Sequence, residues 1–212
     1  MLSRLGTSLD SGTLVALDPS MKATQLLKAQ HEEVAQLFKA LEAASDTDKE
    51  QLFLELASKL TAHDRIEREI FYPSCEDALG MSDVLGAALV EHGIIELGLF
   101  QANEALGEED FAFKVAVLKE LVEHHVEEEE KVLFPRAEKA LGDDSLSLLG
   151  REMEAAFAEA VAGDFREPLY ENLRQVLEGA LQTAPKKSSP VIAKRPLTRS
   201  HDEEPAKSKK TA

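Results

Sequence analysis

Two stretches of this 212-residue chain, His63-Asp-Arg-Ile-Glu67 and His125-Val-Glu-Glu-Glu129, decide how it is expected to fold. In each, a glutamate follows a histidine by four residues, and a proline, Pro73 or Pro135, follows the glutamate by six. Positions i and i+4 lie on one face of an α-helix, about 6 Å apart along its axis. Each stretch therefore predicts a helix that presents an imidazole and a carboxylate to the same side, a mixture of N and O ligands that suits borderline metal cations.

Two further histidines extend this pattern to four helices. His31 and His92 precede His63 and His125, respectively, by about thirty residues. Short links at 45–46 and 107–108 imply antiparallel neighbours, and counting from these turns puts the four histidines within about 5 Å in height, at 1.5 Å per residue. The sequence thus predicts an all-α, up-down-up-down four-helix bundle with its histidines in one layer of the core.

Apolar periodicity and terminal signals give the expected boundaries. The four long helices are expected at 23–44, at 47–72 with a Thr47/Glu50 capping box, at 84–106 with Ser82 as the cap, and at 109–141 with a bend at Pro135 and a stop at Gly142. Residues 73–81 are interpreted as a loop. Two amphipathic pieces at 145–162 and 167–183 are expected to pack outside the bundle as accessory helices, giving a domain at 22–183 between disordered segments at 1–21 and 184–212.

Charge and composition narrow the class of protein. The net charge is −16, but from Pro185 onward eight Lys/Arg face three Asp/Glu, so the first 184 residues carry −21. We expect this part to repel nucleic acid, and the basic tail to suit an acidic partner if it has one. The single cysteine, Cys75, allows no internal disulfide and is interpreted as a loop or core residue. No secretory pattern and no apolar run of about eighteen residues is present, so we expect no membrane role and a cytoplasmic location.

The histidines admit a plainer interpretation, which has to be weighed against a metal site. Any one of them, taken alone, fits a hydrogen-bonded core residue better than a ligand, and a bundle could also turn all of them outward. Four buried imidazoles with interior carboxylates and no cation, however, would cost several kcal/mol of desolvation per ionised group. A metal removes this cost and is the favoured interpretation. The aromatic side chains nearby are interpreted as core around the site: Phe38, Phe71, Tyr72, Phe100 and Phe134.

These motifs resemble the hemerythrin-like (HHE cation-binding) family over about residues 24–141. The resemblance rests on Gln30-His31-Glu32, the segments 61–73 and 123–135, and Glu91-His92-Gly-Ile-Ile-Glu96. It implies a four-helix bundle that encloses two non-haem iron ions bridged by carboxylates and an oxygen species. Carried over, the bridging residues would be Glu67 and Glu129, and the terminal ligands His31, His63, His92 and His125. His124, five residues before Glu129, is the alternative to His125.

One departure from the family pattern affects the expected function. Oxygen-carrying relatives are expected to have a second histidine where this chain has Glu96, and an aspartate five residues after the histidine of the fourth helix. An additional anionic ligand favours ferric iron, so oxygen transport is not expected. Either Glu96 or Asp64 could fill the remaining ligand position.

The resemblance implies a di-iron protein that binds or reacts with O₂, peroxide or nitric oxide, in stress response or in oxygen or iron sensing. Two rivals stand beside it. One is a catalase-like enzyme that disproportionates peroxide, and the other is a regulatory bundle whose metal only stabilises the fold.

Overall fold

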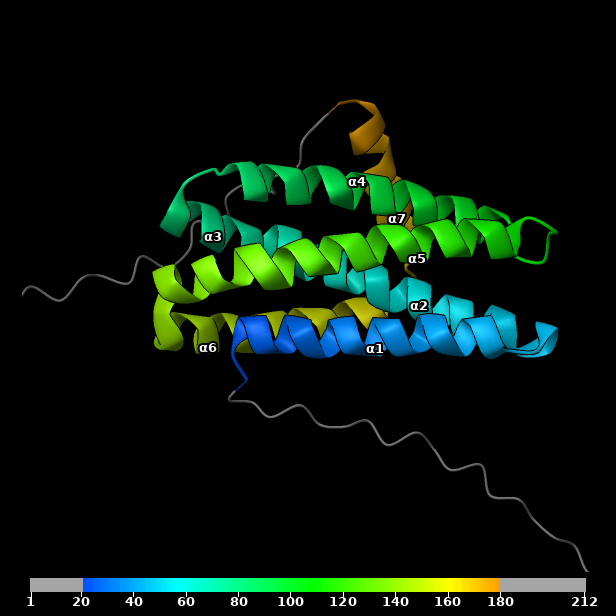
Figure 1. Cartoon of the computed structure of the whole chain (residues 1–212), viewed down its shortest axis with the longest axis horizontal. Coiled ribbons are helices and arrows are strands. Elements are labelled where there is room, and N and C mark those ends of the chain that lie inside the picture. Colours follow the sequence, from blue (N-terminus) through cyan, green and yellow to red (C-terminus); the bar gives the residue numbers. More distant parts are fainter. Residues whose placement is uncertain (1–20, 180–212) are drawn as a thin grey trace, which may run out of the picture.

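The computed structural model describes residues 21–179, and every regular element in that range is a helix. The bundle consists of four helical rods, which begin with α1, α2, α4 and α5 and lie side by side (Figure 1). The first hairpin consists of α1 (Ala23–Ala43) and α2 (Asp46–Ile66), and the second of α4 (Asp83–Glu104) and α5 (Phe111–Glu128). The all-α four-helix bundle predicted from the sequence is therefore confirmed.

The second and fourth rods each continue through a π-helical turn that begins at the glutamate of the motif. These turns are η1 (Glu67–Phe71) and η2 (Glu129–Leu133). In both turns, the residue that follows the turn, Tyr72 or Phe134, donates its backbone N–H to the carbonyl of the glutamate five positions earlier. A proline follows directly, and its ring would clash with the carbonyl four residues before it in a regular α-helix. Widening the helix by one residue relieves that clash.

The π turns let both rods run past their prolines. In the second rod α3 (Tyr72–Leu79) follows η1 and ends at Gly80, whose φ is 76°. The interpretation of 73–81 as a loop was therefore wrong for residues 73–79, which are helical, and Cys75 is a buried residue of α3. In the fourth rod α6 (Phe134–Val161) follows η2, and the disturbance expected at Pro135 takes the form of this π turn.

Two accessory segments cover the bundle, as expected. Within α6 the chain turns sharply at Gly142, where φ is 74° and ψ 167°, and the remainder packs against α1 and α2. After it, α7 (Arg166–Leu177) crosses α4 (Figure 1). Gly93 allows this close crossing, because a Cβ atom there would lie 3.1 Å from a methyl group of Val176. The segments predicted to be disordered, apart from Met21, and the last residues of the second accessory helix lie outside the described residues.

Of the two helix N-caps predicted from the sequence, one is present in the structure and the other is not. Ser82 caps α4, since its hydroxyl accepts a hydrogen bond from the Leu85 N–H at 3.3 Å. The second helix begins at Asp46 with Ser45 as its N-cap residue, so the capping box expected at Thr47 and Glu50 was wrong.

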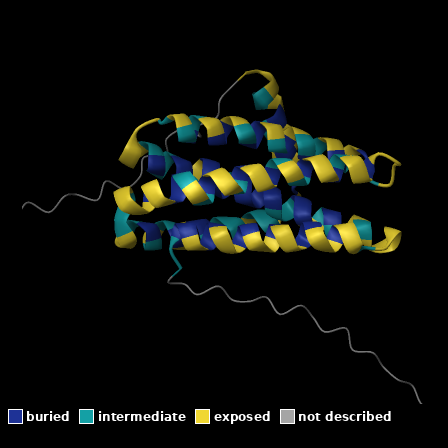
Figure 2. Ribbon diagram, viewed as in Figure 1, coloured by how far each residue is buried: buried dark blue, intermediate teal, exposed yellow. Residues whose placement is uncertain are grey.

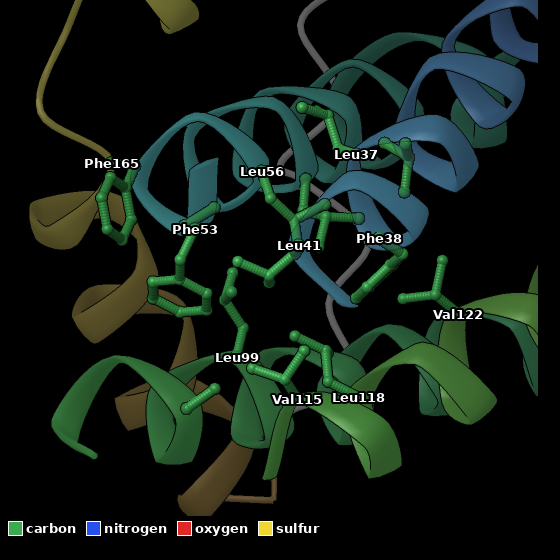
Figure 3. Close-up of a cluster of buried hydrophobic side chains, with 14 of the residues drawn as sticks. Leu37, Phe38, Leu41, Phe53, Leu56, Leu99, Val115, Leu118, Val122 and Phe165 are labelled. Atoms are coloured by element: carbon green, nitrogen blue, oxygen red, sulfur yellow. The ribbon is translucent and has the colours of Figure 1, made fainter. Parts of the chain in front are cut away.

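The core is divided into two clusters by the layer that holds the histidines. Each rod buries one stripe and exposes the opposite one (Figure 2). The first cluster lies toward the turns that close the two hairpins, and its side chains meet between the helices (Figure 3). The second surrounds the π turns and includes Phe71 and Phe134. Truncating a buried leucine of either cluster to alanine costs about 2–5 kcal/mol, so both clusters contribute strongly to the stability of the bundle around this layer. Within residues 21–179, no helix is both long and apolar enough to cross a bilayer.

Candidate metal centre

The four histidines predicted to share a layer meet at the middle of the bundle. His31 Nε2 lies 3.2 Å from His63 Nε2, and His92 Nε2 lies 3.0 Å from His125 Nε2. All four side chains are buried. The structure brings His125 to this layer, whereas the His124 side chain is 65% exposed and lies outside it.

Two buried carboxylates connect the histidine pairs. Glu67 Oε2 lies 3.2 Å from His63 Nε2 and 3.3 Å from His92 Nε2. Glu129 Oε2 lies 3.5 Å from His31 Nε2 and 3.6 Å from His125 Nε2. Each carboxylate thus reaches one histidine of each hairpin, the position that a bridging ligand between two metal ions requires.

The ligand atoms form two groups that share one residue. In each group, all of the ligand atoms lie within 4.8 Å of one another. Between residues 21 and 179, Glu67 Oε1 and Glu129 Oε2 are buried oxygens without a hydrogen-bond partner. Buried carboxylate oxygens left in this state are costly, and a cation would satisfy them, so the donor set fits a metal centre. The groups are His31, His63, Glu67 and Glu129, and Glu67, His92 and His125.

Each imidazole turns its other nitrogen to a side chain of a neighbouring rod. When Nδ1–H donates to such an acceptor, Nε2 keeps a free lone pair for a metal. Every rod supplies one histidine, which contacts an acceptor of one neighbouring rod, and one acceptor, which contacts the histidine of the other neighbouring rod. The pairs are His63 Nδ1 with Gln30 Oε1 at 2.8 Å, His92 with Asp64 Oδ1 at 2.6 Å, His125 with Glu91 Oε2 at 3.0 Å, and His31 with Glu130 Oε1 at 2.9 Å.

Sequence reasoning did not assign these supporting roles. Asp64 was considered as a ligand, but its carboxylate holds Nδ1 of His92 and belongs to neither ligand group. A signal existed for three of the acceptors, because Gln30, Asp64 and Glu91 each adjoin a motif histidine in the chain.

The electrostatics of His92 show what a metal must displace. Burial lowers the pKa of this imidazole, but the bond to Asp64 and the nearby Glu67 outweigh burial and raise the pKa to about 10. Glu67 behaves in the complementary way: burial raises its pKa, but the charges and hydrogen bonds of His63 and His92 together outweigh burial and hold the pKa well below the usual value. Without metal, a proton at His92 takes the place of a cation, and metal binding would release it.

Tyr72 has a more central place than the sequence indicated. Its hydroxyl donates to Glu129 Oε1 at 2.8 Å and lies 2.8 Å from His92 Nε2. Burial and the two carboxylates raise the pKa of the phenol well above its usual value. The equivalent residue of the other motif, Phe134, has no hydroxyl and stacks on His31 with ring centroids 5.8 Å apart. The ring of Tyr72 therefore serves packing, and its hydroxyl adds a further candidate ligand atom.

Glu96, predicted as a ligand, lies outside both groups. It is buried, and its Oε1 lies 3.4 Å from Arg68 Nη1. Burial, and next the negative charge of Asp64, raise the pKa of the Glu96 carboxyl to about 8. The side chain borders a cavity of about 40 Å³ that the four imidazoles also line. Because one water needs only about 10–15 Å³ measured in this way, the cavity has room for a diatomic molecule.

A bundle with two histidine pairs and shared buried carboxylates defines a metal-binding helical protein. The family model of the hemerythrin HHE cation binding domain matches residues 22–137, more than half of the chain. The chain belongs to this family.

Two known proteins show how far the likeness extends. A crystal structure of a hemerythrin HHE cation binding domain-containing protein from Mycobacterium kansasii has the same fold, with a TM-score of 0.63 and 24% identity over 72% of this chain and 99% of that one. A DNA nickase of Nostoc sp. is 26% identical over 139 residues, 64% of this chain. This chain spans only 39% of the length of that relative.

Proposed function

We propose that the chain is a non-haem di-iron protein whose centre binds or reacts with O₂, peroxide or nitric oxide, in stress response or in oxygen or iron sensing. The observation that carries this proposal is the position of Glu67, whose Oε2 lies 3.2 and 3.3 Å from histidine nitrogens of two different hairpins. The second buried carboxylate, Glu129, repeats this arrangement on the other histidines. Iron is the proposed metal because imidazole and carboxylate together suit it and because the family is the hemerythrin one.

The side chains have separate tasks in this proposal. The two ligand groups would hold one metal each, with Glu67 between them. Bound iron would supply a redox-active Lewis acid for a small oxygen or nitrogen ligand. The acceptors Gln30, Asp64, Glu91 and Glu130 keep each imidazole in the tautomer that leaves Nε2 free.

A catalase-like peroxide-disproportionating enzyme is the second candidate. The cavity beside the histidines favours it over a purely structural metal, because it offers a reactant a place next to the centre. Nucleic acid is not proposed as a substrate, since the first 184 residues carry a charge of −21. We also propose a cytoplasmic location, and an acidic partner for the basic residues beyond Pro185.

Metal analysis after expression in iron-replete medium tests the proposal. We expect about two irons per chain, because the two ligand groups provide one position each, and an oxo-to-ferric absorption in the near ultraviolet. Rapid oxygen evolution from peroxide would select the catalase-like candidate. Recovery of zinc alone, with no such absorption after anaerobic iron loading, would contradict the di-iron proposal and favour a regulatory bundle whose metal only stabilises the fold.

A further inference from the structure

The helix α4 is apolar on almost every side, although 30% of the residues of the chain are charged. Between its terminal residues, Asp83 and Glu104, the acidic side chains are Glu91 and Glu96, and both are used inside the bundle. Glu91 Oε2 lies 3.0 Å from His125 Nδ1, and Glu96 is buried. A helix that is apolar all round is normally buried on all sides. The outward side of α4 is therefore expected to be covered.

This outward side is nevertheless exposed, and it continues onto α5. Val90, Ile94 and Leu97 follow one another at helical spacing on α4 and are 42–47% exposed. Phe113 and Val117 lie one turn apart on α5 and are 74% and 55% exposed. These five side chains, here named the α4/α5 face, are half of the ten large apolar side chains that are exposed in the part of the chain that the structure describes. They form a patch and are not scattered singly over the surface.

The outward side of the first hairpin has a different character. The exposed side chains of α1 include Lys28, Glu32, Glu33 and Lys39, which water solvates well. The second half of α6 also packs against α1 and α2 (Figure 1). The first hairpin is thus solvated or covered by the chain itself, whereas the second hairpin presents an apolar face.

The α4/α5 face is complementary to itself in shape and in charge. It contains a groove of about 450 Å³, and the exposed ring of Phe113 stands beside that groove. Asp110 and Lys114 also line the groove and form an ion pair at 2.8 Å, so the rim holds one acid and one base. A face with both a groove and a projecting ring can pair with an identical face about a two-fold axis. We propose that the α4/α5 face is a dimer interface, in which Phe113 of each copy enters the groove of the other.

Charge and area favour a second copy over another partner. The first 184 residues carry −21, but this face holds only a neutral ion pair, so a strongly charged partner would gain little by binding here. The five side chains expose on the order of 400 Å² of apolar surface. A standard interface buries about 800 Å² per partner, slightly more than half of it apolar. Two such faces with their polar rims meet this requirement.

Sedimentation equilibrium of the full chain measures the association. We expect a dimer with a Kd of about 1 μM or tighter. Association should be tighter at high salt, because salt screens the repulsion between two acidic bundles and leaves the apolar contact intact. In Phe113→Asp, Kd should rise at least about 100-fold, because a ring is lost and a charge is placed in the interface in both copies. A monomeric unmodified chain at concentrations far above micromolar would overturn the proposal.

A matched pair of variants separates the interface from general effects of a new surface charge. Ile94 on α4 is 46% exposed, and Leu148 on α6 is 47% exposed. Ile94→Asp should dissociate the dimer, and Leu148→Asp should not. Circular dichroism and metal content verify that each variant is folded, since none of the five side chains of the face belongs to a ligand group. Equal dissociation in Leu148→Asp, or a dimer that persists in Phe113→Asp, would overturn the interface.

Hydroxyl-radical labelling of Phe113 in the unmodified chain tells a second copy from a segment of the same chain. Labelling of this ring should fall as the protein concentration passes Kd. Protection that is equal at every concentration would mean that the same chain covers the ring, and undiminished labelling in the dimer would mean that another face associates. Either result would overturn the proposal, and neither depends on whether the centre binds iron.

Discussion

His92 of the second hairpin donates its Nδ1–H to Asp64 Oδ1 of the first at 2.6 Å, the shortest of the four bonds that hold the central imidazoles. Asp64 Oδ2 in turn accepts a hydrogen bond from Asn172 and lies 3.4 Å from Arg68 Nε, so Asp64 joins a metal-facing imidazole to two side chains outside the histidine layer. Removing such an outer partner commonly lowers metal affinity 10–100-fold. Asp64→Ala is expected to weaken iron binding by this factor in a competition titration with a chelator.

The matched variants locate the cause of that loss. Asp64→Asn keeps an acceptor oxygen and should weaken iron binding less than Asp64→Ala. Asp83→Asn, at the start of α4, changes the same charge far from the site and should have no effect. Equal affinity in Asp64→Ala and the unmodified chain would show that His92 does not depend on this bond.

Metal removal should lower the melting temperature, because metal binds the folded bundle and not the unfolded chain. A ligand present at about 100 times its Kd adds about 2.7 kcal/mol to the free energy of unfolding. Calorimetry with and without chelator measures this difference. His63→Ala and His125→Ala should abolish most metal binding and with it the effect of the chelator, whereas His124→Ala, with its side chain 65% exposed, should retain both. A chelator effect that persists in His63→Ala would contradict the assigned site.

Tyr72→Phe tests whether the hydroxyl at the centre binds iron. A phenolate bound to ferric iron gives a visible charge-transfer absorption, which this variant should lose while keeping its iron and its fold. The fold should survive because Phe134 occupies the equivalent position of the other motif. The matched control is Tyr170→Phe, which changes the chain's other tyrosine at the surface. An unchanged visible spectrum in Tyr72→Phe would show that the hydroxyl only donates a hydrogen bond.

The Glu96→Gln variant tests whether Glu96 binds iron, as the sequence predicted, or lies outside the ligand set, as the structure indicates. Because Glu96 lies outside both ligand groups, the variant should keep about two irons per chain, and Glu67→Gln should not. Loss of iron in Glu96→Gln would restore Glu96 as a ligand.

The Glu96→Gln substitution should also change how the stability of the metal-free protein depends on pH. The folded pKa of Glu96 is about 8 against an ordinary value of 4.5, so the folded metal-free chain binds the additional proton between these values. Stability from this group is present below pH 4.5 and is lost as the pH rises toward 8, by at most about 1.4 kcal/mol per pH unit. Urea unfolding of the metal-free proteins should therefore show a flatter decline from pH 5 to 8 in Glu96→Gln. Parallel curves would contradict the assigned pKa.

The histidine layer could be predicted from the sequence because turn positions and a fixed rise per residue determine height along a rod. The π turns could not, since apolar spacing does not show whether a helix ends before Pro73 or widens and continues past it. Glu96 illustrates a second limit. Spacing from His92 places it on the correct face, but its partner Arg68 comes from another helix, and only the packed structure brings the two together.

The ring of histidine and acceptor pairs also fixes the rotation of the rods. Each rod gives one imidazole to a neighbour and receives another, so the four bonds close a cycle around the bundle axis. A slip of one residue would turn a helix by about 100° and take both of its bonds out of reach. Apolar side chains can repack after such a turn, whereas these directional bonds cannot. The ring therefore fixes how each of the four helices is rotated about its own axis at this level, and it does so before any metal binds.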